Sequence, residues 1–244
     1  MSNSLSRPYA DYFPFGVSLR VPGMQYAADI SLSGPYCAKW SAPLALSANG
    51  LLAAGQMVNG SAFSVTTFTA GVGTATAIGN NGLVPIDSLT IRSHWGRNIT
   101  AVASAANART LTVTGYDYLG SKMVEALTMN GTTTVQGLKA FAWIESLALS
   151  SDTDVTTVNV GWGNKFGLPY KGVTMQTEIK NEAVAANAGT FTAGLLDATT
   201  ETSTNADCRG TYLPATVIPD GTNVFEIWYI PNRTNLHGQA RPTS

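Results

Sequence analysis

Charged side chains are scarce in this sequence of 244 residues, because Asp, Glu, Lys and Arg together make up only 12% of it. That share is about half of what globular proteins usually carry. The formal net charge is −1, and Lys and Arg nowhere form a cluster. Binding to nucleic acid requires several basic side chains that displace counterions from phosphates, so we expect no nucleic acid partner. The sequence leaves two explanations for the low surface charge open: partner proteins cover the surface, or threonine coats it.

Histidine and cysteine are also rare, with two of each. Cys37 and Cys208 lie far apart and lack the spacing of zinc ligands, so we predict no metal site and two reduced thiols in a cytoplasmic setting. His94 falls in a strand pattern beside Trp95, and His237 falls in a polar tail. Neither position favours a Ser-His-Asp arrangement. We therefore predict no catalytic residue, no cofactor and no enzymatic activity.

Long apolar runs are absent as well. No stretch approaches the roughly 18 uninterrupted apolar residues of a membrane-spanning helix, so we expect no membrane partner. Residues 1–20 lack a basic start followed by an apolar run, which predicts no secretory signal.

Acidic residues are the remaining candidates for catalysis, since glycoside hydrolysis requires only two carboxyl groups that the fold brings together. The candidates by residue type are Glu125, Glu145, Glu178, Glu182 and Glu226. Glu125, Glu145 and Glu226 each lie in an apolar segment that we expect to be a strand. A charge on the solvent face of a sheet is the ordinary interpretation of such a position. The sequence brings no two of these residues together, so no catalytic pair is assigned.

What the sequence has in abundance is threonine, with 30 residues, and glycine, with 24. Threonine favours pleated surfaces, and glycine permits tight turns. From about residue 60 onward, short segments alternate apolar and polar residues, which is typical of half-buried strands. The expected strands are residues 63–70, 89–95, 109–116, 123–129, 141–149, 155–160, 173–179 and 224–230. Only residues 177–188 resemble a helix, and their first part overlaps an expected strand.

Turn sequences separate these segments. Asn-Gly pairs at residues 81–82 and 130–131, and Asp220-Gly221, tolerate the positive φ that two-residue hairpin turns require. The pattern of many short strands divided by turns predicts an all-β body with a jelly-roll or β-sandwich fold. We place this body at residues 46–231 and a polar C-terminal tail at residues 232–244.

Residues 1–45 differ from the rest because prolines recur among aromatic residues. Prolines at this density oppose a long helix or a central strand, while the aromatic side chains favour burial. An extended N-terminal arm satisfies both demands. Its target is either the chain's own body or a neighbouring subunit, and we favour the neighbour. The expected interface anchors are Tyr9, Tyr12, Phe13, Phe15, Tyr26, Tyr36 and Trp40.

Two blocks of the sequence are familiar. Residues 115–170 read GYDYLGSKMVEALTMNGTTTVQGLKAFAWIESLALSSDTDVTTVNVGWGNKFGLPY, and residues 207–231 read DCRGTYLPATVIPDGTNVFEIWYIP. The first block resembles a pattern that recurs in structural proteins of tailed bacteriophages: an aromatic-rich strand, an N-G-T turn, G-x-K-A-F, another strand and G-L-P. The second is similar to the closing segment of that pattern, with R-G-T-Y, a D-G turn and a final strand. Together they cover about a third of the chain.

Among such proteins, the chain most resembles capsid decoration (cement) proteins. The resemblance implies a virion location after synthesis in the cytoplasm of a bacterial host. It implies two partners, the major capsid protein and further copies of the chain, with a homotrimer preferred. Two alternatives remain open: a tail-associated β protein such as a tube, adaptor or fibre base, and a carbohydrate-binding receptor protein.

Overall fold

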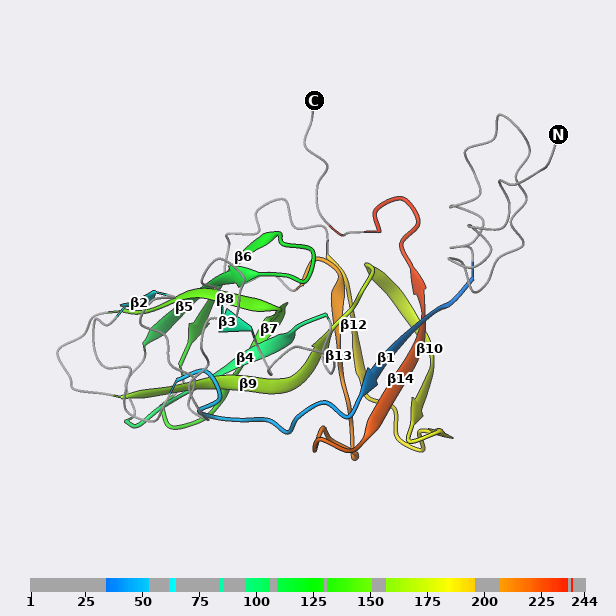
Figure 1. Ribbon diagram of the computed structural model, residues 1–244, viewed down its shortest axis with the longest axis horizontal. Coiled ribbons are helices and arrows are strands. Elements are labelled where there is room, and N and C mark those ends of the chain that lie inside the picture. Colours follow the sequence, from blue (N-terminus) through cyan, green and yellow to red (C-terminus); the bar gives the residue numbers. More distant parts are fainter. Residues whose placement is uncertain are drawn as a thin grey trace, which may run out of the picture.

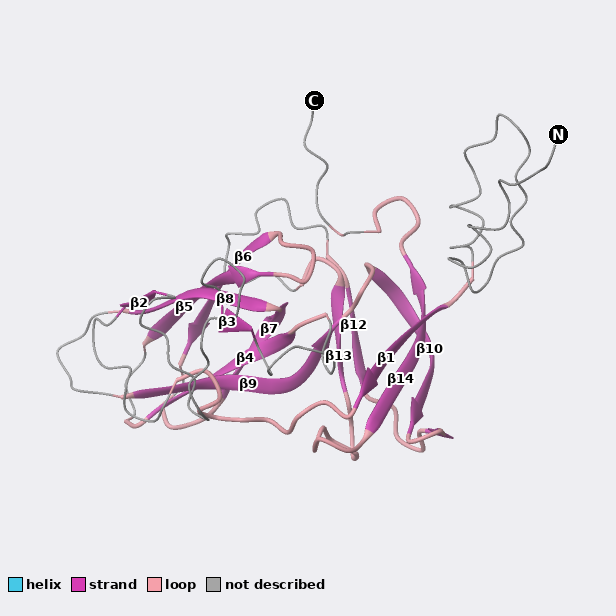
Figure 2. Cartoon of the chain, viewed as in Figure 1, coloured by secondary structure: helices cyan, strands magenta, loops and turns pink. Residues whose placement is uncertain are grey.

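The regular elements that the structure describes are all β-strands, and the strands pair in antiparallel sheets (Figure 2). The computed structural model describes residues 34–52, 62–64, 84–85, 95–105, 109–129, 131–150, 157–195, 207–236 and 238. The sheets pack as a sandwich-like body, which confirms the all-β prediction. Residues 1–33, both histidines and nearly all of the expected strand 89–95 lie outside the described residues.

Sheet A lies at one end of the molecule (Figure 1). Its strands, in spatial order, are β1 (Tyr36–Ser41), β14 (Val224–Pro231), β10 (Gly172–Lys180) and β11 (Ala183–Val184). Asn181 and Glu182 join β10 to β11 with φ angles of 49° and 67°. Positive φ at both central positions is characteristic of a type I′ hairpin turn. The segment 177–188, which resembled a helix in sequence, is therefore a hairpin.

Sheet B crosses the middle of the molecule. Its strands, in spatial order, are β12 (Thr190–Ala193), β13 (Gly210–Leu213), β9 (Val158–Gly167), β4 (Arg97–Ala103) and β7 (Val135–Phe141). The segment after β1 crosses β9, where Ser47 and Trp162 exchange two main-chain hydrogen bonds of 3.1 Å. A Cβ atom at Gly161 would lie 1.7 Å from the Ser47 carbonyl oxygen, so this crossing requires glycine.

Sheet C forms the other end of the body. Its path runs through β2 (Ala62–Ser64), β8 (Trp143–Leu149), β5 (Thr110–Tyr116) and β6 (Lys122–Thr128), and β3 (Val84–Pro85) also pairs with β8. The expected strand 109–116 coincides closely with β5, and 123–129 with β6. The expected strand 141–149 is interrupted, because Phe141 ends β7 and β8 starts at Trp143.

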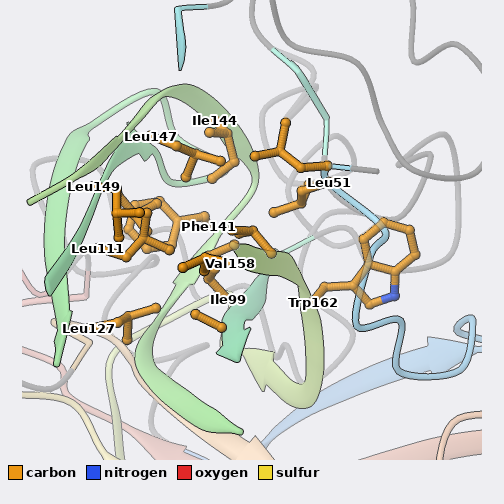
Figure 3. Packing of buried hydrophobic residues seen from close by; sticks show 14 of the residues in the cluster. Leu51, Ile99, Leu111, Leu127, Phe141, Ile144, Leu147, Leu149, Val158 and Trp162 are labelled. Carbon is orange, nitrogen blue, oxygen red and sulfur yellow. The ribbon is translucent and has the colours of Figure 1, made fainter. Parts of the chain in front are cut away.

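Two apolar clusters fill the spaces between the sheets. The first cluster lies between sheets B and C and includes Ile99, Val158, Leu111 and Leu147 (Figure 3). The second lies between sheets A and B and is mainly aromatic. Its fully buried members are Ala38, Trp40, Phe166, Leu168, Tyr212, Phe225, Ile227 and Tyr229. The long strand β9 serves both clusters, with its first half in one and Phe166 in the other.

The described part of the predicted arm belongs to the body. Trp40 is 0% exposed and stacks on Phe166 and Tyr212 at ring distances of 5.0 and 5.6 Å. Tyr36 packs edge-on against Tyr170 and Tyr229. The assignment of residues 36–41 to an arm is therefore wrong. Alternate residues of this segment face the core, and the prolines at 35 and 43 only flank the strand instead of excluding it.

Candidate functional site

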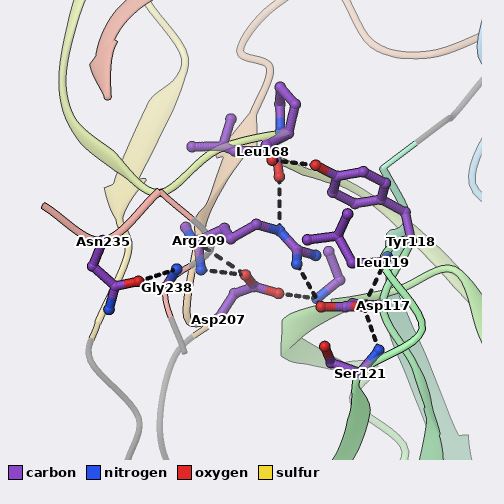
Figure 4. Close-up of polar contacts among 12 residues, drawn as sticks. Asp117, Tyr118, Leu119, Ser121, Leu168, Asp207, Arg209, Asn235 and Gly238 are labelled. Atoms are coloured by element: carbon purple, nitrogen blue, oxygen red, sulfur yellow. Dashed lines mark hydrogen bonds and ion pairs between the residues drawn. The ribbon is translucent and has the colours of Figure 1, made fainter. Parts of the chain in front are cut away.

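A buried ion network joins the two familiar sequence blocks (Figure 4). Arg209 Nη1 lies 2.5 Å from Asp117 Oδ2, and both side chains are 0% exposed. Arg209 Nε donates to the Leu168 carbonyl at 3.0 Å, and its guanidinium group lies over the Tyr118 ring at 4.6 Å. Because neither charged side chain reaches the surface, this network holds the architecture together and cannot contact a ligand in this conformation.

Two carboxylates arrange the main chain around Arg209. Asp117 accepts N–H bonds from Leu119 at 2.9 Å and Ser121 at 2.8 Å, which closes the turn from β5 to β6. Asp207 accepts N–H bonds from Ala140 of β7 and from Arg209 itself, both at 2.9 Å. Burial opposes the charge of Arg209, but Asp207 and Asp117 outweigh burial and raise its pKa. The network thus fastens sheet C, sheet B and the link between β9 and β10 at one point.

A second buried pair supports sheet A from its inner side. Lys180 Nζ lies 2.8 Å from Glu178 Oε1, and both side chains are less than a tenth exposed. The Tyr212 hydroxyl donates to the same carboxylate, and Lys180 also donates to the Ala215 carbonyl. Burial, followed by the bond to Glu178, raises the pKa of Tyr212. The polar groups of this cluster bind one another, so we assign the cluster a structural role.

Glu125 of β6 points into the junction between sheets C and B. Its Oε1 accepts N–H bonds from Leu138 at 2.5 Å and Lys139 at 3.4 Å in β7, and a Cβ at Gly137 would lie 2.7 Å from its Oε2. Glu125 is 1% exposed, so the interpretation of it as a solvent-face charge is wrong. Burial raises the pKa of Glu125 to about 7, although the two amides and the charges of Lys139 and Lys165 act to lower it.

The other glutamates also have separate roles. Glu145 pairs with Lys122 at 3.1 Å. Glu182 occupies the exposed hairpin turn. Glu178 and Glu226 lie on neighbouring strands, but on opposite faces of sheet A, because Glu178 is paired with core residue Ile227. These two do not form a catalytic pair across one cleft.

The outer face of sheet A is the candidate binding surface. Register places Val224, Trp228 and Ile230 of β14 on this face, opposite the core residues of the same strand. All three are half-buried, and Thr177 of β10 and Val184 of β11 extend the face. Val184 is 74% exposed. A strand that is apolar on both faces is typical of a strand covered on both faces. The aromatic core lies against the inner face of β14.

The acidic residue of this face is neutralised within the chain. Glu226 Oε1 accepts a hydrogen bond from Trp228 Nε1 at 3.0 Å, and its Oε2 lies 3.8 Å from Lys39 Nζ. The Cys37 thiol bonds to the same carboxylate, and burial followed by the charge of Glu226 raises the pKa of Cys37 to about 12. A partner that covers the face therefore needs no cation to match Glu226.

The predicted interface anchors divide into two groups. Tyr9, Tyr12, Phe13, Phe15 and Tyr26 lie outside the described residues, and Tyr36 and Trp40 belong to β1 and its core. Val224, Trp228 and Ile230 were not among the residues predicted from the sequence to form a binding surface. The signal was present in the segment VFEIWYI, in which apolar residues are adjacent where a strand with one wet face would alternate.

Comparison with protein-family models, with curated proteins and with solved structures found no match to this chain. Within the part of the chain that the structure describes, no three His, Cys, Asp or Glu residues gather as metal ligands would. Those same residues contain no helix of the length and apolarity that a membrane crossing requires.

Proposed function

We propose that this chain is a structural subunit of a tailed-phage virion, most like a capsid decoration (cement) protein, and that it acts by binding. The observation that carries the binding function is the apolar outer face of sheet A, with its one acid already neutralised. The virion location rests on the resemblance of residues 115–170 and 207–231 to tailed-phage structural proteins.

The contacts between the two familiar blocks support a structural role for the sequence pattern that they contain. Asp117 and Leu168 of the first block both bind Arg209 of the second. One charged residue from each block, Asp117 and Arg209, therefore meet at one buried point where they hold three segments together. A pattern that specifies such a joint is what a family of structural proteins would keep in common.

Three buried acids have structural roles, which agrees with the proposed binding function. Asp117 and Asp207 are sealed from solvent, and Glu178 is occupied by Lys180 and Tyr212. A general acid or nucleophile must reach its substrate, which these carboxylates do not. The partners in this proposal are the major capsid protein and further copies of the chain.

The assembly that we propose is a homotrimer. Coat lattices contain threefold sites, which a trimer matches by symmetry. The low charge of the chain agrees with a surface that is largely covered in the assembly, since charged residues are depleted at the centres of interfaces.

Particles assembled without the chain test this function. If the chain is cement, heads should form and package DNA, but they should release it at a lower temperature than wild-type heads, and purified protein should restore the loss. Heads that are equally stable with and without the chain would contradict the proposal. Failure to attach tails would instead favour the tail-associated alternative.

A further inference from the structure

Two irregularities in the pairing of sheet B meet at Asn98 of strand β4. The pairing of β4 with β9 shifts register between Arg97 and Ile99, and its pairing with β7 shifts between Asn98 and Thr100. Bulges of this kind turn a side chain away from its regular direction. Asn98 is 0% exposed, so its amide group must find its hydrogen-bond partners inside the protein.

The Asn98 amide is fixed beside a lysine of the neighbouring strand. Its Oδ1 accepts the main-chain N–H of Lys165 at 3.0 Å, and its Nδ2 donates to Gln136 Oε1 at 2.9 Å. Nδ2 also donates to the Gly137 carbonyl oxygen at 3.4 Å, and Lys165 Nζ donates to the same oxygen at 3.0 Å. The amine of Lys165 and the amide of Asn98 are therefore neighbours on one carbonyl oxygen.

Glu125 brings a carboxyl group to the same place. Its Oε1 accepts two main-chain amides, but its buried Oε2 has no hydrogen-bond partner among the described residues. A Cβ atom at Gly137 would lie 2.7 Å from this Oε2. The unpartnered oxygen thus lies against the residue whose carbonyl group binds both Lys165 and Asn98.

Burial favours the uncharged forms of the acid and the amine. It raises the pKa of Glu125 to about 7, and it lowers the pKa of Lys165, although the charges of Glu125 and Asp207 oppose that lowering. An acid that titrates near neutral pH is suited to taking up and returning protons. A lysine with a lowered pKa is more often present as the free amine, which is the nucleophilic form.

We propose that Lys165 and Asn98 join in an isopeptide bond between β9 and β4, with Glu125 as the group that transfers protons. Glu125 takes a proton from the Lys165 ammonium group, and the amine so formed attacks Asn98 Cγ. The flexible stem of lysine lets Nζ turn from the Gly137 oxygen to this carbon. The Lys165 N–H that already binds Asn98 Oδ1 stabilises the negative charge that develops there.

The second half of the reaction releases ammonia. Glu125 passes its proton to Asn98 Nδ2 and takes a second proton from Lys165 Nζ, while the Cγ–Nδ2 bond breaks. The products are one secondary amide, one ammonia molecule and a protonated Glu125, and no oxidant or other reactant is required. Well-oriented groups within one molecule reach effective concentrations of about 10⁵–10⁸ M, so a slow amide exchange becomes feasible in a folded chain.

The bond changes what the fold can withstand. It ties two paired strands of sheet B and closes a loop that contains β5, β6, β7 and β8 (Figure 1). A closed loop limits the conformations of the unfolded chain and so favours the folded one. The reaction takes place once in each chain and does not depend on the proposed virion function.

The mass of the purified full-length protein under denaturing conditions tests this bond. The wild type should fall short of its sequence mass by one ammonia molecule, and a digest should contain one branched peptide with both Asn98 and Lys165. Glu125→Gln and Lys165→Arg should each have their full sequence mass. Glu145→Gln, at the ion pair on the surface of sheet C, is the matched control and should keep the loss.

A wild-type protein with its full sequence mass would overturn the inference. So would a loss of ammonia that maps to Gln136, to a single asparagine or to any other pair of residues. A branched peptide that persists in Glu125→Gln would overturn the role given to Glu125. Should Glu125→Gln fail to fold, as judged by circular dichroism, Glu125→Leu takes its place, because apolar residues of similar size often substitute for buried charges.

Discussion

At the scale of single residues, Glu125 connects two sheets through an ionisable group. Its carboxylate accepts the amides of Leu138 and Lys139, and the groups charged nearby are Lys139 and Lys165. Burial raises the pKa of Glu125 to about 7, whereas an unfolded glutamate titrates near pH 4.3. Between these two pH values the folded chain binds more protons than the unfolded chain, so the free energy of unfolding falls as the pH rises.

The substitution Glu125→Gln should remove this dependence. Glutamine keeps an acceptor oxygen for the two amides but stays neutral at every pH. Between about pH 4.5 and pH 7, ionisation of Glu125 should lower the free energy of unfolding of the wild type by up to about 3 kcal/mol. The variant should lack this contribution. Guanidinium unfolding across this pH range measures the difference. Glu145→Gln, at a solvent-accessible ion pair, is the control and should keep the wild-type slope. If the free energy of unfolding of the Glu125 variant depends on pH as that of the wild type does, the Glu125 carboxyl group is not the cause of the dependence.

At the scale of elements, alternation in the sequence predicted the strands whose two faces have different surroundings. β5, β6 and β10 lie close to their expected positions because one face of each meets a core. β14 also lies close to its expected position, although apolar residues occupy both of its faces. β4 was missed because Arg97, Asn98 and Thr100 are buried on a bulged strand, so no alternation marks it. The outer face of sheet A was missed for another reason. It combines residues from three strands, and only the register brings them together.

The type I′ turn assigned between β10 and β11 can be tested by substitution. Glu182 has a φ of 67°, in the left-handed region that costs a non-glycine residue about 1 kcal/mol. The substitution Glu182→Gly creates an Asn-Gly turn and should raise the free energy of unfolding by about 0.5–1 kcal/mol. Asn181→Gly is the control, and it should destabilise the fold because the Asn181 side chain bonds to Asn223 and Val224. Destabilisation by Glu182→Gly in urea unfolding would contradict the assigned turn.

At the scale of the whole molecule, the start of β1 separates the body from the segment proposed to bind. If the chain acts as proposed, deleting residues 1–33 should leave the body folded and soluble but should abolish oligomer formation and binding to phage heads. Deleting residues 1–41 also removes Trp40 from the aromatic core, and losing a buried tryptophan costs about 3–5 kcal/mol. Thermal unfolding should therefore show a large loss for the longer deletion alone. Equal losses for both deletions would mean that residues 1–33 belong to the core.

The all-β class of the molecule followed from composition and turn spacing, whereas its buried charges did not. Asp117 lies 92 residues before Arg209 in the sequence, and only the folded chain brings the two together. No local pattern distinguishes such residues from surface charges. Binding faces are hard to predict from sequence for the same reason. The residues of such a face come from several strands, and only the pairing of those strands brings them together.

Imaging of the virion by cryo-electron microscopy tests the central claim most directly. If the chain is a decoration protein of a tailed phage, the reconstructed head of that phage should carry hundreds of copies, as three-lobed density at the threefold sites of the coat lattice. The sandwich-like body should fit each lobe, with connecting density over the outer face of sheet A. Absence of the chain from the head, or its presence in only about a dozen copies on the tail, would contradict the account.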